Sequence, residues 1–569
     1  MRRWVERPVE LSKVNQLIAE LDIHRILARI LVGRGIDSPI KAKNYLEPAL
    51  NQLPDPDALA GMSAACSRLA RALLNGEKIG VFGDYDVDGV TSSVILSEFL
   101  ESLGAQVFVT LPNRLTEGYG LSLAGLERLE KQGVSLIVTV DCGVTAHEEI
   151  DLAMAKNIDI IVIDHHTVPV TLPNAVAVIN PHRKDCTRLA EHLCAAGVVF
   201  NLCMALRKYL REAGFFKTRP EPNLLRLLDL VALGTVADVV PLIEDNRIFV
   251  QKGLELIKQG LRPGIKALLD AAKIESHKAT AGTLGFHLGP RINAAGRLEN
   301  AMSALDLLRS RDYSKAFAMA EQLDASNQER RELEKQIVEE ALAEIAGSKE
   351  HQEAFAIIVG RDSWHPGVVG IVASRLVEKT GKPSIVIGQG GKGSGRSIPG
   401  FHLHEALCAI EECLLGFGGH AHAVGVHIDL AELELVQDAF RDHAAQKLKP
   451  EDLVPVVYHD GEIALEDLDE GLIEHMARAA PFGRSNPEPV FVLRGVKIGE
   501  FRELKGGHLK GQVLGDRPIE FIAFGMADRQ VLFAGSTDLL VTPEINEWLG
   551  KRTLQLRVKD ARTMALSQT

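Results

Sequence analysis

Three aspartates alternate with other residues in the heptapeptide GDYDVDG (residues 83–89), directly after the apolar run IGVF. Negative charges this close together repel one another unless a cation, or solvent at a turn, relieves the repulsion. The flanking glycines also suit an ordinary turn, so the motif alone leaves both readings open. Asp84, Asp86 and Asp88 are therefore candidate metal ligands, and the choice depends on the residues that accompany them.

Two further polar clusters follow apolar runs in the same region: DCG, which begins at Asp141, and DHH, which comprises Asp164, His165 and His166. Carboxylates with one or two imidazoles and no cysteine favour Mn²⁺ or Mg²⁺ over a structural zinc ion. Several carboxylates in one place can hold two such ions, which activate water and stabilise the leaving oxygen in phosphoryl transfer. Each cluster alone is also typical of a strand-end turn, so it is their joint occurrence that indicates a metal centre.

The elements that must position these clusters are strands of a parallel sheet. Between residues 76 and 180, short apolar runs alternate with helical patterns, which predicts a parallel α/β fold. The runs KIGVF, SLIVTV and IDIIVI each lead directly into one of the polar clusters. Because ligands of open α/β sheets gather at the carboxyl ends of strands, we expect the three clusters to converge in space.

A long helix is predicted to follow this region. Residues 311–346 contain no glycine or proline, and their apolar residues fall at helical spacing. The helix is a plausible spacer between two α/β regions. A coiled-coil dimer is the weaker alternative because the apolar stripe covers few heptads, so we expect a monomer.

A second α/β region and a β-rich region complete the predicted fold. Strand-like AFAIIVG and PSIVIGQ flank a helical segment, residues 450–480 are markedly acidic, and short β-like pieces follow. The β-like pieces predict a small closed barrel, for which an OB-like fold is one option. We expect the following domains: an N-terminal segment over 1–60, the first α/β domain over 61–305, the linker helix over 306–350, the second α/β domain over 351–449 and the barrel over 450–569.

Composition limits the kinds of partner. The chain has 569 residues, 46% of them hydrophobic, and a net charge of −12. A general electrostatic attraction to nucleic acid is therefore excluded, and a nucleic-acid substrate would need a locally basic groove, whereas a small anionic substrate would need only a few arginines. The number of cysteines is odd and none forms a CxxC pair, which favours a reduced cytoplasm. No apolar run approaches the ~18 residues of a membrane span, and no apolar stretch follows MRRWVERPVE. These observations predict a cytoplasmic protein without membrane attachment.

The motifs, taken in order, carry a resemblance. GDYDVDG, DCG, DHH and TVADVVPL resemble the four motifs of the DHH phosphoesterase superfamily. HLGPRINAAGRL, WHPGVVGIVASRL, GSGRS and GGHAHAVG are similar to its branch of bacterial single-strand-specific 5′→3′ DNA exonucleases. The resemblance covers nearly the whole chain. It implies a DHH lobe, a DHHA1-type lobe, an OB-like barrel, two Mn²⁺ or Mg²⁺ ions, and degradation of single-stranded DNA to nucleoside monophosphates in repair and recombination.

The resemblance also implies which residues hold the ions. Asp141 would bridge the two ions and His165 would ligate one of them, with Asp88 supporting the other aspartates of its motif. Asp238, in TVADVV, would supply the fourth motif's carboxylate, although an N-cap or turn aspartate is the alternative. The complete implied ligand set is Asp84, Asp86, Asp88, Asp141, His165 and Asp238.

Three more residues are implied to act in catalysis. Asp164 and His166 would orient His165 and the scissile phosphate, and His420, in GFGGHAHAVG, would contact phosphate or the leaving group. A core histidine that donates to a backbone carbonyl is the alternative for His166, and a purely structural turn is the alternative for the glycine-rich segment.

Arginine and serine are implied to bind the terminal 5′ phosphate. Arg396 and Ser394 match in GSGRS, where a glycine-rich turn would present backbone N–H groups to an anion. Arg114 matches as well, and Arg291 and Arg297 are candidates, because a planar guanidinium binds phosphate bidentately. A surface charge at Arg114 and a flexible loop at GGKGSGRS are the alternatives.

The predicted barrel is the candidate module for long single strands. Residues 480–515 hold six Lys or Arg against three acidic residues, directly after the acidic stretch. Such barrels pair a basic groove with stacking side chains. Phe491, Phe501 and Phe524 are the stacking candidates, although core packing is the expected role of at least two of them.

Two other functions stay open. One is a DHH phosphodiesterase acting on short oligonucleotides or cyclic dinucleotides, which the C-terminal β region and GPRINAAGR disfavour. The other is an inactive scaffold, which the intact aspartates and DHH disfavour. Single-stranded DNA is the expected partner. A helicase and a single-strand-binding protein are further candidate partners, which no motif in the sequence identifies.

Overall fold

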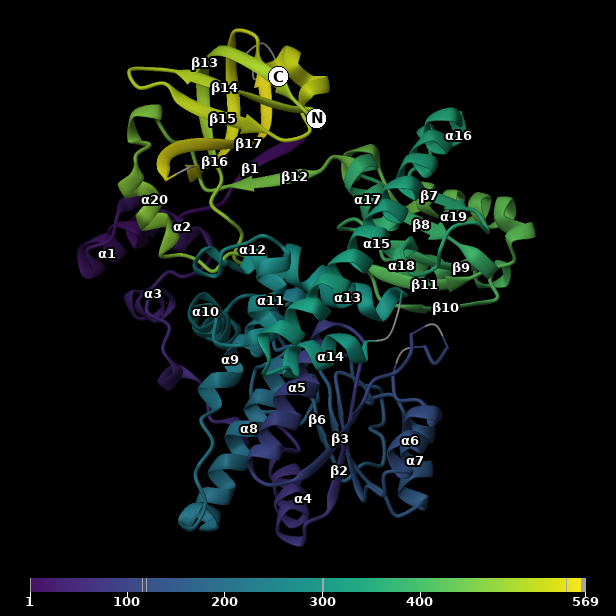
Figure 1. Cartoon of the computed structure of the whole chain (residues 1–569). Helices are drawn as coiled ribbons and strands as arrows, with labels where there is room; N and C mark the ends of the chain where they lie inside the picture. Colours follow the sequence, from purple (N-terminus) through teal and green to yellow (C-terminus); the bar gives the residue numbers. More distant parts are fainter. Residues whose placement is uncertain (1, 115, 119, 299–300, 549, 564–569) are drawn as a thin grey trace. The chain divides into compact units, whose positions relative to one another are not determined.

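The computed structural model describes residues 2–114, 116–118, 120–298, 301–548 and 550–563, apart from the side chains of residues 297, 298 and 548 (Figure 1). It forms two compact units. One comprises Trp4–Ile292, Ala301–Ala320 and Tyr458–Thr569, and the other is built mainly from Glu321–Val457. Within the described residues, no helix is both long enough and apolar enough to cross a membrane.

The first unit contains the predicted parallel sheet. Its strands lie in the order β3-β2-β4-β5-β6 and all neighbouring pairs are parallel. All of these strands except the edge strand β3 are almost wholly buried, which explains why they appear in the sequence as continuous apolar runs. Their bounds are β2 Lys78–Gly83, β3 Gln106–Thr110, β4 Leu136–Val140, β5 Asp159–Ile163 and β6 Ala177–Ile179.

Helices cover both faces of this sheet (Figure 1). One face is covered by α4 (Met62–Asn75), α5 (Val87–Ser102) and α8 (Ala195–Glu212), and the other by α6 (Leu123–Glu130) and α7 (His147–Ala155). The apolar helix α9 (Leu228–Ala237) packs on α5 and α8, and Asp238 is its C-cap. Further helices of this part of the chain are α10 Glu244–Gln259, α11 Pro263–Ala271, α12 Ala281–Thr283, a π-helical turn over Leu284–Leu288, α13 Gly289–Leu298 and α14 Met302–Arg309.

The predicted long helix is confirmed as α15 (Tyr313–Gly347). Its C-terminal half and α17 (Val369–Thr380) share a core with β7 and β8, through residues such as Ile337, Ala341 and Val372. On the other side of the same sheet lie α18 (Leu403–Cys408) and α19 (Leu433–Lys447). The sheet has the order β10-β11-β9-β8-β7, in which only β7 and β8 are parallel. The bounds are α16 Lys349–Glu353, β7 Ile357–Gly360, β8 Ser384–Ile387, β9 Lys392–Arg396, β10 Gly416–Gly419 and β11 Ala423–His427.

The motif GSGRS forms a strand rather than the expected turn. Its first four residues lie in β9, which pairs with β8 on one edge and β11 on the other, so their backbone groups are engaged in the sheet. The glycines serve close packing, because a Cβ at Gly393 would lie 2.4 Å from Ile387 Cδ1 and one at Gly395 would lie 2.7 Å from Val424 Cγ2. The expectation of a backbone anion nest at this motif is therefore wrong.

The C-terminal region is a closed five-stranded barrel of the expected OB-like kind. Its order is β13-β14-β15-β17-β16, with β16 returning to β13 and β15 parallel to β17. Phe491 is buried in its core, Phe501 is partly buried against the same core, and Phe524 is 52% exposed. Two of the three stacking candidates thus pack inside, as expected. The bounds are β13 Phe491–Leu504, β14 His508–Leu514, β15 Ile519–Ala523, β16 Ser536–Trp548 and β17 Lys551–Thr563, preceded by α20 Glu470–Ala477.

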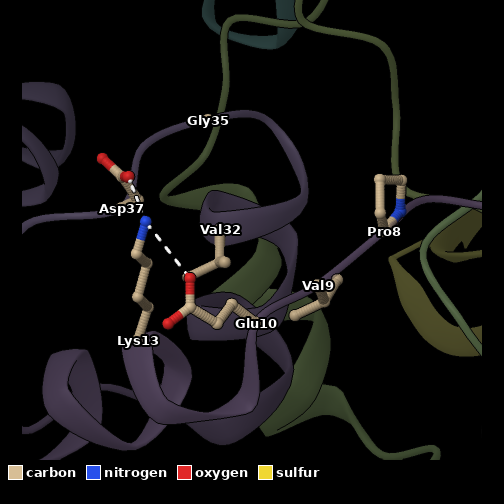
Figure 2. Close-up of a pocket in the computed structure, with 7 residues that line it drawn as sticks. All are labelled: Pro8, Val9, Glu10, Lys13, Val32, Gly35 and Asp37. Carbon is tan, nitrogen blue, oxygen red and sulfur yellow. Dashed lines mark hydrogen bonds and ion pairs between the residues drawn. The ribbon is translucent and has the colours of Figure 1, made fainter.

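The N-terminal segment packs against this barrel. Ile30 of α2 belongs to the barrel core, and Trp4 Nε1 donates to Asp560 Oδ2 at 2.8 Å. A pocket of about 400 Å³ lies between the first helices, where Lys13 pairs with Asp37 at 2.7 Å and with Glu10 at 3.3 Å (Figure 2). The bounds are α1 Leu11–Leu21, α2 Arg25–Gly33 and α3 Pro39–Leu46, and β1 Arg3–Glu6 forms a two-stranded sheet with β12 Val456–His459.

Candidate metal centre

The first aspartate cluster forms the turn between β2 and α5. Asp86 is the N-cap of α5, and its Oδ1 accepts hydrogen bonds from the backbone N–H groups of Asp88 at 2.9 Å and Gly89 at 3.1 Å. Gly89 is required here, because a Cβ at this position would lie 2.4 Å from the backbone oxygen of Asp84. The tight turn therefore brings Asp84, Asp86 and Asp88 together at the start of α5.

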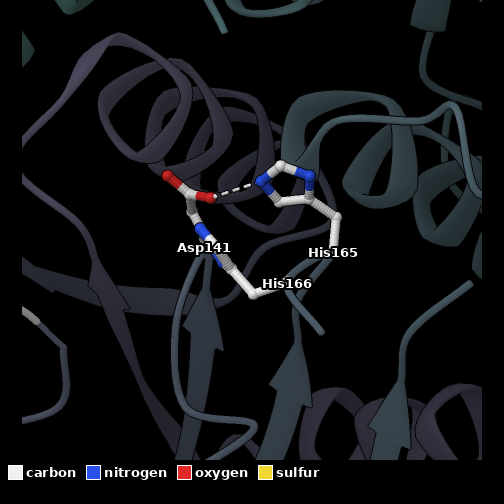
Figure 3. A group of neighbouring side chains, drawn as sticks. All are labelled: Asp141, His165 and His166. Carbon is white, nitrogen blue, oxygen red and sulfur yellow. Dashed lines mark ion pairs between the residues drawn. The ribbon is translucent and has the colours of Figure 1, made fainter. Parts of the chain in front are cut away.

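Asp141 extends directly from the end of β4 in an unusual conformation. Its φ is 63°, in the left-handed region, and its N–H donates to the carbonyl of Ile163 at 2.9 Å. Non-glycine residues held in this region concentrate at functional sites, where the surrounding structure maintains the strain. The carboxylate points toward the ring of His165, and Asp141 Oδ1 lies 3.1 Å from His165 Nε2 (Figure 3).

One nitrogen of His165 is surrounded by carboxylates from three parts of the chain. Besides Asp141, His165 Nε2 lies 3.7 Å from Asp238 Oδ2 and 3.8 Å from Asp88 Oδ2. Burial, reinforced by the charge of His166, lowers the pKa of His165 to about 3. The imidazole is therefore neutral at physiological pH and offers a lone pair to a cation.

Asp164 supports the two histidines rather than joining this cluster. Its carboxylate accepts hydrogen bonds from the backbone N–H groups of His165 at 2.7 Å, His166 at 3.0 Å and Val144 at 3.0 Å, and it lies 2.7 Å from His166 Nδ1. Burial alone would raise the pKa of Asp164, but its hydrogen bonds, led by that with His166, lower it. Asp164 thus holds the DHH turn in a single conformation.

The remaining carboxylates are electrostatically frustrated without a cation. Burial, followed by repulsion from neighbouring aspartates, raises the pKa of Asp84, Asp141 and Asp238 well above the ordinary value and that of Asp88 to about 7. Within the described residues, Asp84 Oδ1 and Asp238 Oδ2 are buried and accept no hydrogen bond. Buried charges of this kind require a counter-charge.

The donor set fits Mn²⁺ or Mg²⁺. Three groups of potential ligands each have their donor atoms within 4.8 Å of one another, and together they comprise five carboxylates and two imidazoles. Asp141 and His165 occur in more than one group, as expected for a centre that holds two ions. The groups are Asp84–Asp86–Asp141, Asp88–His165–Asp238 and Asp141–His165–His166.

Asp88 also accepts hydrogen bonds from a distant part of the chain, a contact that no sequence motif predicts. Its Oδ2 accepts from the N–H of Ala195 at 2.6 Å, and its Oδ1 from the N–H of Ala196 at 2.9 Å. The carboxylate therefore lies against the N-terminus of α8, where the helix dipole favours a negative charge. These bonds favour the supporting role that the resemblance implies for Asp88 over direct ligation.

The predicted phosphate-binding residues are distributed over both units. Arg114 lies over the ring of Tyr85, with 5.2 Å between the guanidinium carbon and the ring centroid, and its charge acts on Asp84. Arg291 is buried and donates to the carbonyl of His287 at 2.7 Å, and the side chain of Arg297 lies outside the described residues.

Ser394, Arg396 and His420 belong to the unit that contains β9. Ser394 and Arg396 lie on the same face of β9, against the first turn of α17. His420 donates its backbone N–H to Ala423 O at 2.8 Å in the turn between β10 and β11. The glycine-rich segment around His420 is thus a β-hairpin.

Comparisons with known proteins agree with this architecture. The DHH family N-terminal domain matches residues 78–235, the DHHA1 domain matches 352–448 and the RecJ OB domain matches 459–560. The single-stranded-DNA-specific exonuclease RecJ of Dickeya dadantii is 39% identical over 555 residues, which cover 94% of this chain and 95% of the relative.

Solved structures give the same answer. RecJ from Thermus thermophilus in complex with Mn²⁺ superimposes with a TM-score of 0.83 at 32% identity, over 99% of this chain and 79% of that one. A complex of the same Thermus thermophilus protein with Mg²⁺ superimposes with a TM-score of 0.77 at 30% identity, over 99% and 78% of the two chains. With its three domains, its strand-end carboxylates and this similarity along nearly its whole length, the chain belongs to the RecJ family of single-stranded-DNA-specific exonucleases.

Proposed function

We propose that this protein is a metal-dependent exonuclease that degrades single-stranded DNA from the 5′ end to nucleoside monophosphates, in DNA repair and recombination. The observation that carries the proposal is the buried carboxylate cluster around the neutral His165, at 3.1 Å from Asp141. This cluster stands at the strand ends of a chain that belongs to the RecJ family. We also propose that the protein is cytoplasmic and monomeric, and that a helicase and a single-strand-binding protein are its partners.

The ions would be held by Asp84, Asp86, Asp141, His165 and Asp238, with Asp88 in support. Two Mn²⁺ or Mg²⁺ ions, when bound, supply an activated water and stabilise the leaving oxygen of phosphoryl transfer. The chain's own contribution is orientation: Asp164 accepts from the backbone N–H groups of His165 and His166 and contacts the His166 ring at Nδ1, and the centroids of the two rings lie 4.5 Å apart. This contact supports the role proposed for His166, which is to orient the scissile phosphate.

A digestion assay tests the function. With Mn²⁺ present, a long single strand labelled at its 5′ end is expected to release labelled mononucleotide from the first turnover, while the same strand in a duplex stays intact. Chelation with EDTA is expected to stop the reaction, and added Mn²⁺ to restore it. Cleavage of short oligomers alone would favour a DHH phosphodiesterase of another kind, and no cleavage would favour an inactive scaffold.

The 5′ phosphate is proposed to bind at Ser394 and Arg396. A Cβ added to Gly370, in the first turn of α17, would lie 3.4 Å from both Ser394 Oγ and Arg396 Nη2. An anion beside these two side chains would therefore meet a guanidinium, a hydroxyl and a helix N-terminus together.

Arg396→Ala is accordingly expected to lower kcat/KM about 10-fold to 100-fold on 5′-phosphorylated strands, because charge-assisted hydrogen bonds contribute about 1.5–3 kcal/mol. Strands with a 5′ hydroxyl should lose much less. Lys392→Ala removes an exposed charge from the same strand and serves as the control. An equal loss on both substrates would indicate a general backbone contact instead.

A further inference from the structure

The segment between α20 and β13 brings an arginine to the edge of the metal centre. Arg484 Nη1 donates to the backbone oxygen of Val239 at 3.2 Å, and the N–H of Leu242 donates to the backbone oxygen of Arg484 at 2.9 Å. Val239 directly follows Asp238, the proposed fourth-motif ligand. The connection to the C-terminal barrel thus touches the loop that carries a proposed metal ligand.

On the Arg484 side, hydrogen bonds fix the backbone that makes this contact. The N–H of Gly483 donates to Asn486 O at 2.8 Å, and the N–H of Asn486 donates to Gly483 O at 3.1 Å, which closes a tight turn around Arg484. Asn486 is buried, and its Nδ2 donates to Ala479 O at 2.9 Å and Pro481 O at 2.7 Å. The backbone of Arg484 is therefore held in place without help from its own side chain.

The opposite side of the contact is strained. Val239 has a φ of 57°, which is rare for a β-branched residue, and its side chain is 59% exposed. Such a conformation persists only where neighbours over-determine it, and concentrates at functional sites. Both hydrogen bonds with Arg484 are made by residues of the loop that follows Asp238, namely Val239 and Leu242.

Most N–H donors of the Arg484 guanidinium have no hydrogen-bond partner among the described residues. The side chain is exposed, and among the described residues it forms no ion pair with a carboxylate. A guanidinium carries five N–H donors, of which the contact with Val239 engages one. Because this contact is made to the residue directly after Asp238, the guanidinium lies beside the proposed metal centre.

We propose that Arg484 contacts the substrate, by binding the phosphodiester next to the scissile one on its 3′ side. The inference rests on the proposed function. In an exonuclease that starts at the 5′ end, the strand beyond the scissile bond continues only in the 3′ direction, and the terminal phosphate has its own proposed site at Ser394 and Arg396. A guanidinium suits a phosphodiester oxygen because it donates from a rigid fork. The C-terminal segment would then complete the active site as well as bind long strands.

The test compares two variants on two substrates. The first substrate is a 5′-phosphorylated single strand, and the second carries a neutral methylphosphonate in place of the phosphate on the 3′ side of the scissile one. On the first, Arg484→Ala is expected to lower kcat/KM about 10-fold to 100-fold, mainly through KM, and Arg484→Lys to restore part of the loss. On the second, the wild-type protein should lose a similar factor and Arg484→Ala should lose nothing further, because the two changes remove one interaction.

Two controls separate the alternatives. Arg478→Ala removes an exposed charge from the same segment and should leave both substrates unaffected. Mn²⁺ titration should give the same affinity for Arg484→Ala as for the wild-type protein. A weakened Mn²⁺ affinity with equal losses on both substrates would overturn the proposal in favour of a purely structural effect on Asp238. If the wild-type protein cleaves the strand and Arg484→Ala matches it, only this inference fails; if the wild-type protein cleaves no single strand, the proposed function fails first.

Discussion

Hydrolysis of single-stranded DNA is expected to fall about 10³-fold or more when Asp141 is replaced by asparagine, equivalent to at least about 4 kcal/mol of activation free energy. Asp141 is buried, and its carboxylate belongs to two of the three potential ligand groups. An amide of the same shape keeps the packing but removes the negative charge that two cations would share. The measurement is kcat/KM on a labelled single strand at saturating Mn²⁺.

Asparagine is the right substitution because of the backbone. With φ at 63°, Asp141 occupies the left-handed region, which asparagine also tolerates. Alanine would add backbone strain to the loss of the ligand and would blur the result. Asp151→Asn, at an exposed position of α7, makes the same chemical change away from the centre and should retain full activity.

The same variant should stabilise the metal-free protein. Burial, followed by the charges of Asp86, Asp88, Asp84 and Asp238, raises the pKa of Asp141 well above its value in the unfolded chain. For a carboxyl group this sign means that ionisation opposes folding, so metal-free stability declines as pH rises above the unfolded pKa. Removing the ionisable group should raise the thermal midpoint in EDTA at neutral pH and shrink the further rise that Mn²⁺ produces. A lower midpoint in EDTA, or near wild-type turnover, would contradict the assignment.

The position of the centre could be predicted because parallel strands end at one edge. GDYDVDG, DCG and DHH each follow an apolar run, and in the structure the clusters meet at the carboxyl ends of β2, β4 and β5. Asp238 lies at the end of a helix instead, so periodicity alone could not place it, and it was identified only through the resemblance of its motif.

Other features had no local signal in the sequence. The bonds of Asp88 to the N-terminus of α8 join residues more than a hundred positions apart, as does the contact of Arg484 with Val239. At GSGRS the signal was misleading, because glycine suits both a turn and a crowded strand, and only the packing of Gly393 against Ile387 decides between them. Contacts between distant segments depend on tertiary structure that no short motif encodes.

Arg247 shows how much stability depends on such a distant contact. The residue lies in α10 and is buried, and burial lowers the pKa of its guanidinium to about 10, so it remains charged at neutral pH. Its donors reach backbone oxygens of two other parts of the same unit. Nε donates to Tyr45 O at 2.8 Å, Nη1 to Ala479 O at 3.0 Å, and Nη2 to Arg478 O at 3.3 Å and Ala480 O at 2.7 Å.

Arg247→Met is therefore expected to destabilise the protein by about 3–5 kcal/mol. Methionine retains much of the apolar contact, but it leaves the partly buried carbonyl groups of Tyr45, Arg478 and Ala480 without their charged donor, at about 1–3 kcal/mol each where no other donor replaces it. The buried carbonyl of Ala479 keeps the donors Tyr45 Oη and Asn486 Nδ2. It also removes the guanidinium that stacks 3.6 Å above the ring centroid of Tyr45. The measurement is the urea midpoint in EDTA, with Arg226→Met, at an exposed position, as the control that should change stability by no more than about 0.5 kcal/mol.

The loss should appear in stability far more than in chemistry. Arg247 contacts none of the proposed metal ligands. Its link to the metal centre is indirect, because it binds the carbonyl groups of residues 478–480, which precede Arg484 in the chain. Below the new unfolding midpoint, kcat on a short single strand should stay within a few-fold of wild type, while KM rises if the turn that holds Arg484 loosens. A variant as stable as the wild-type protein would show that the carbonyls find other donors, and that the Arg247 hydrogen bonds are not needed to hold the N-terminal helices and the C-terminal segment to the catalytic domain.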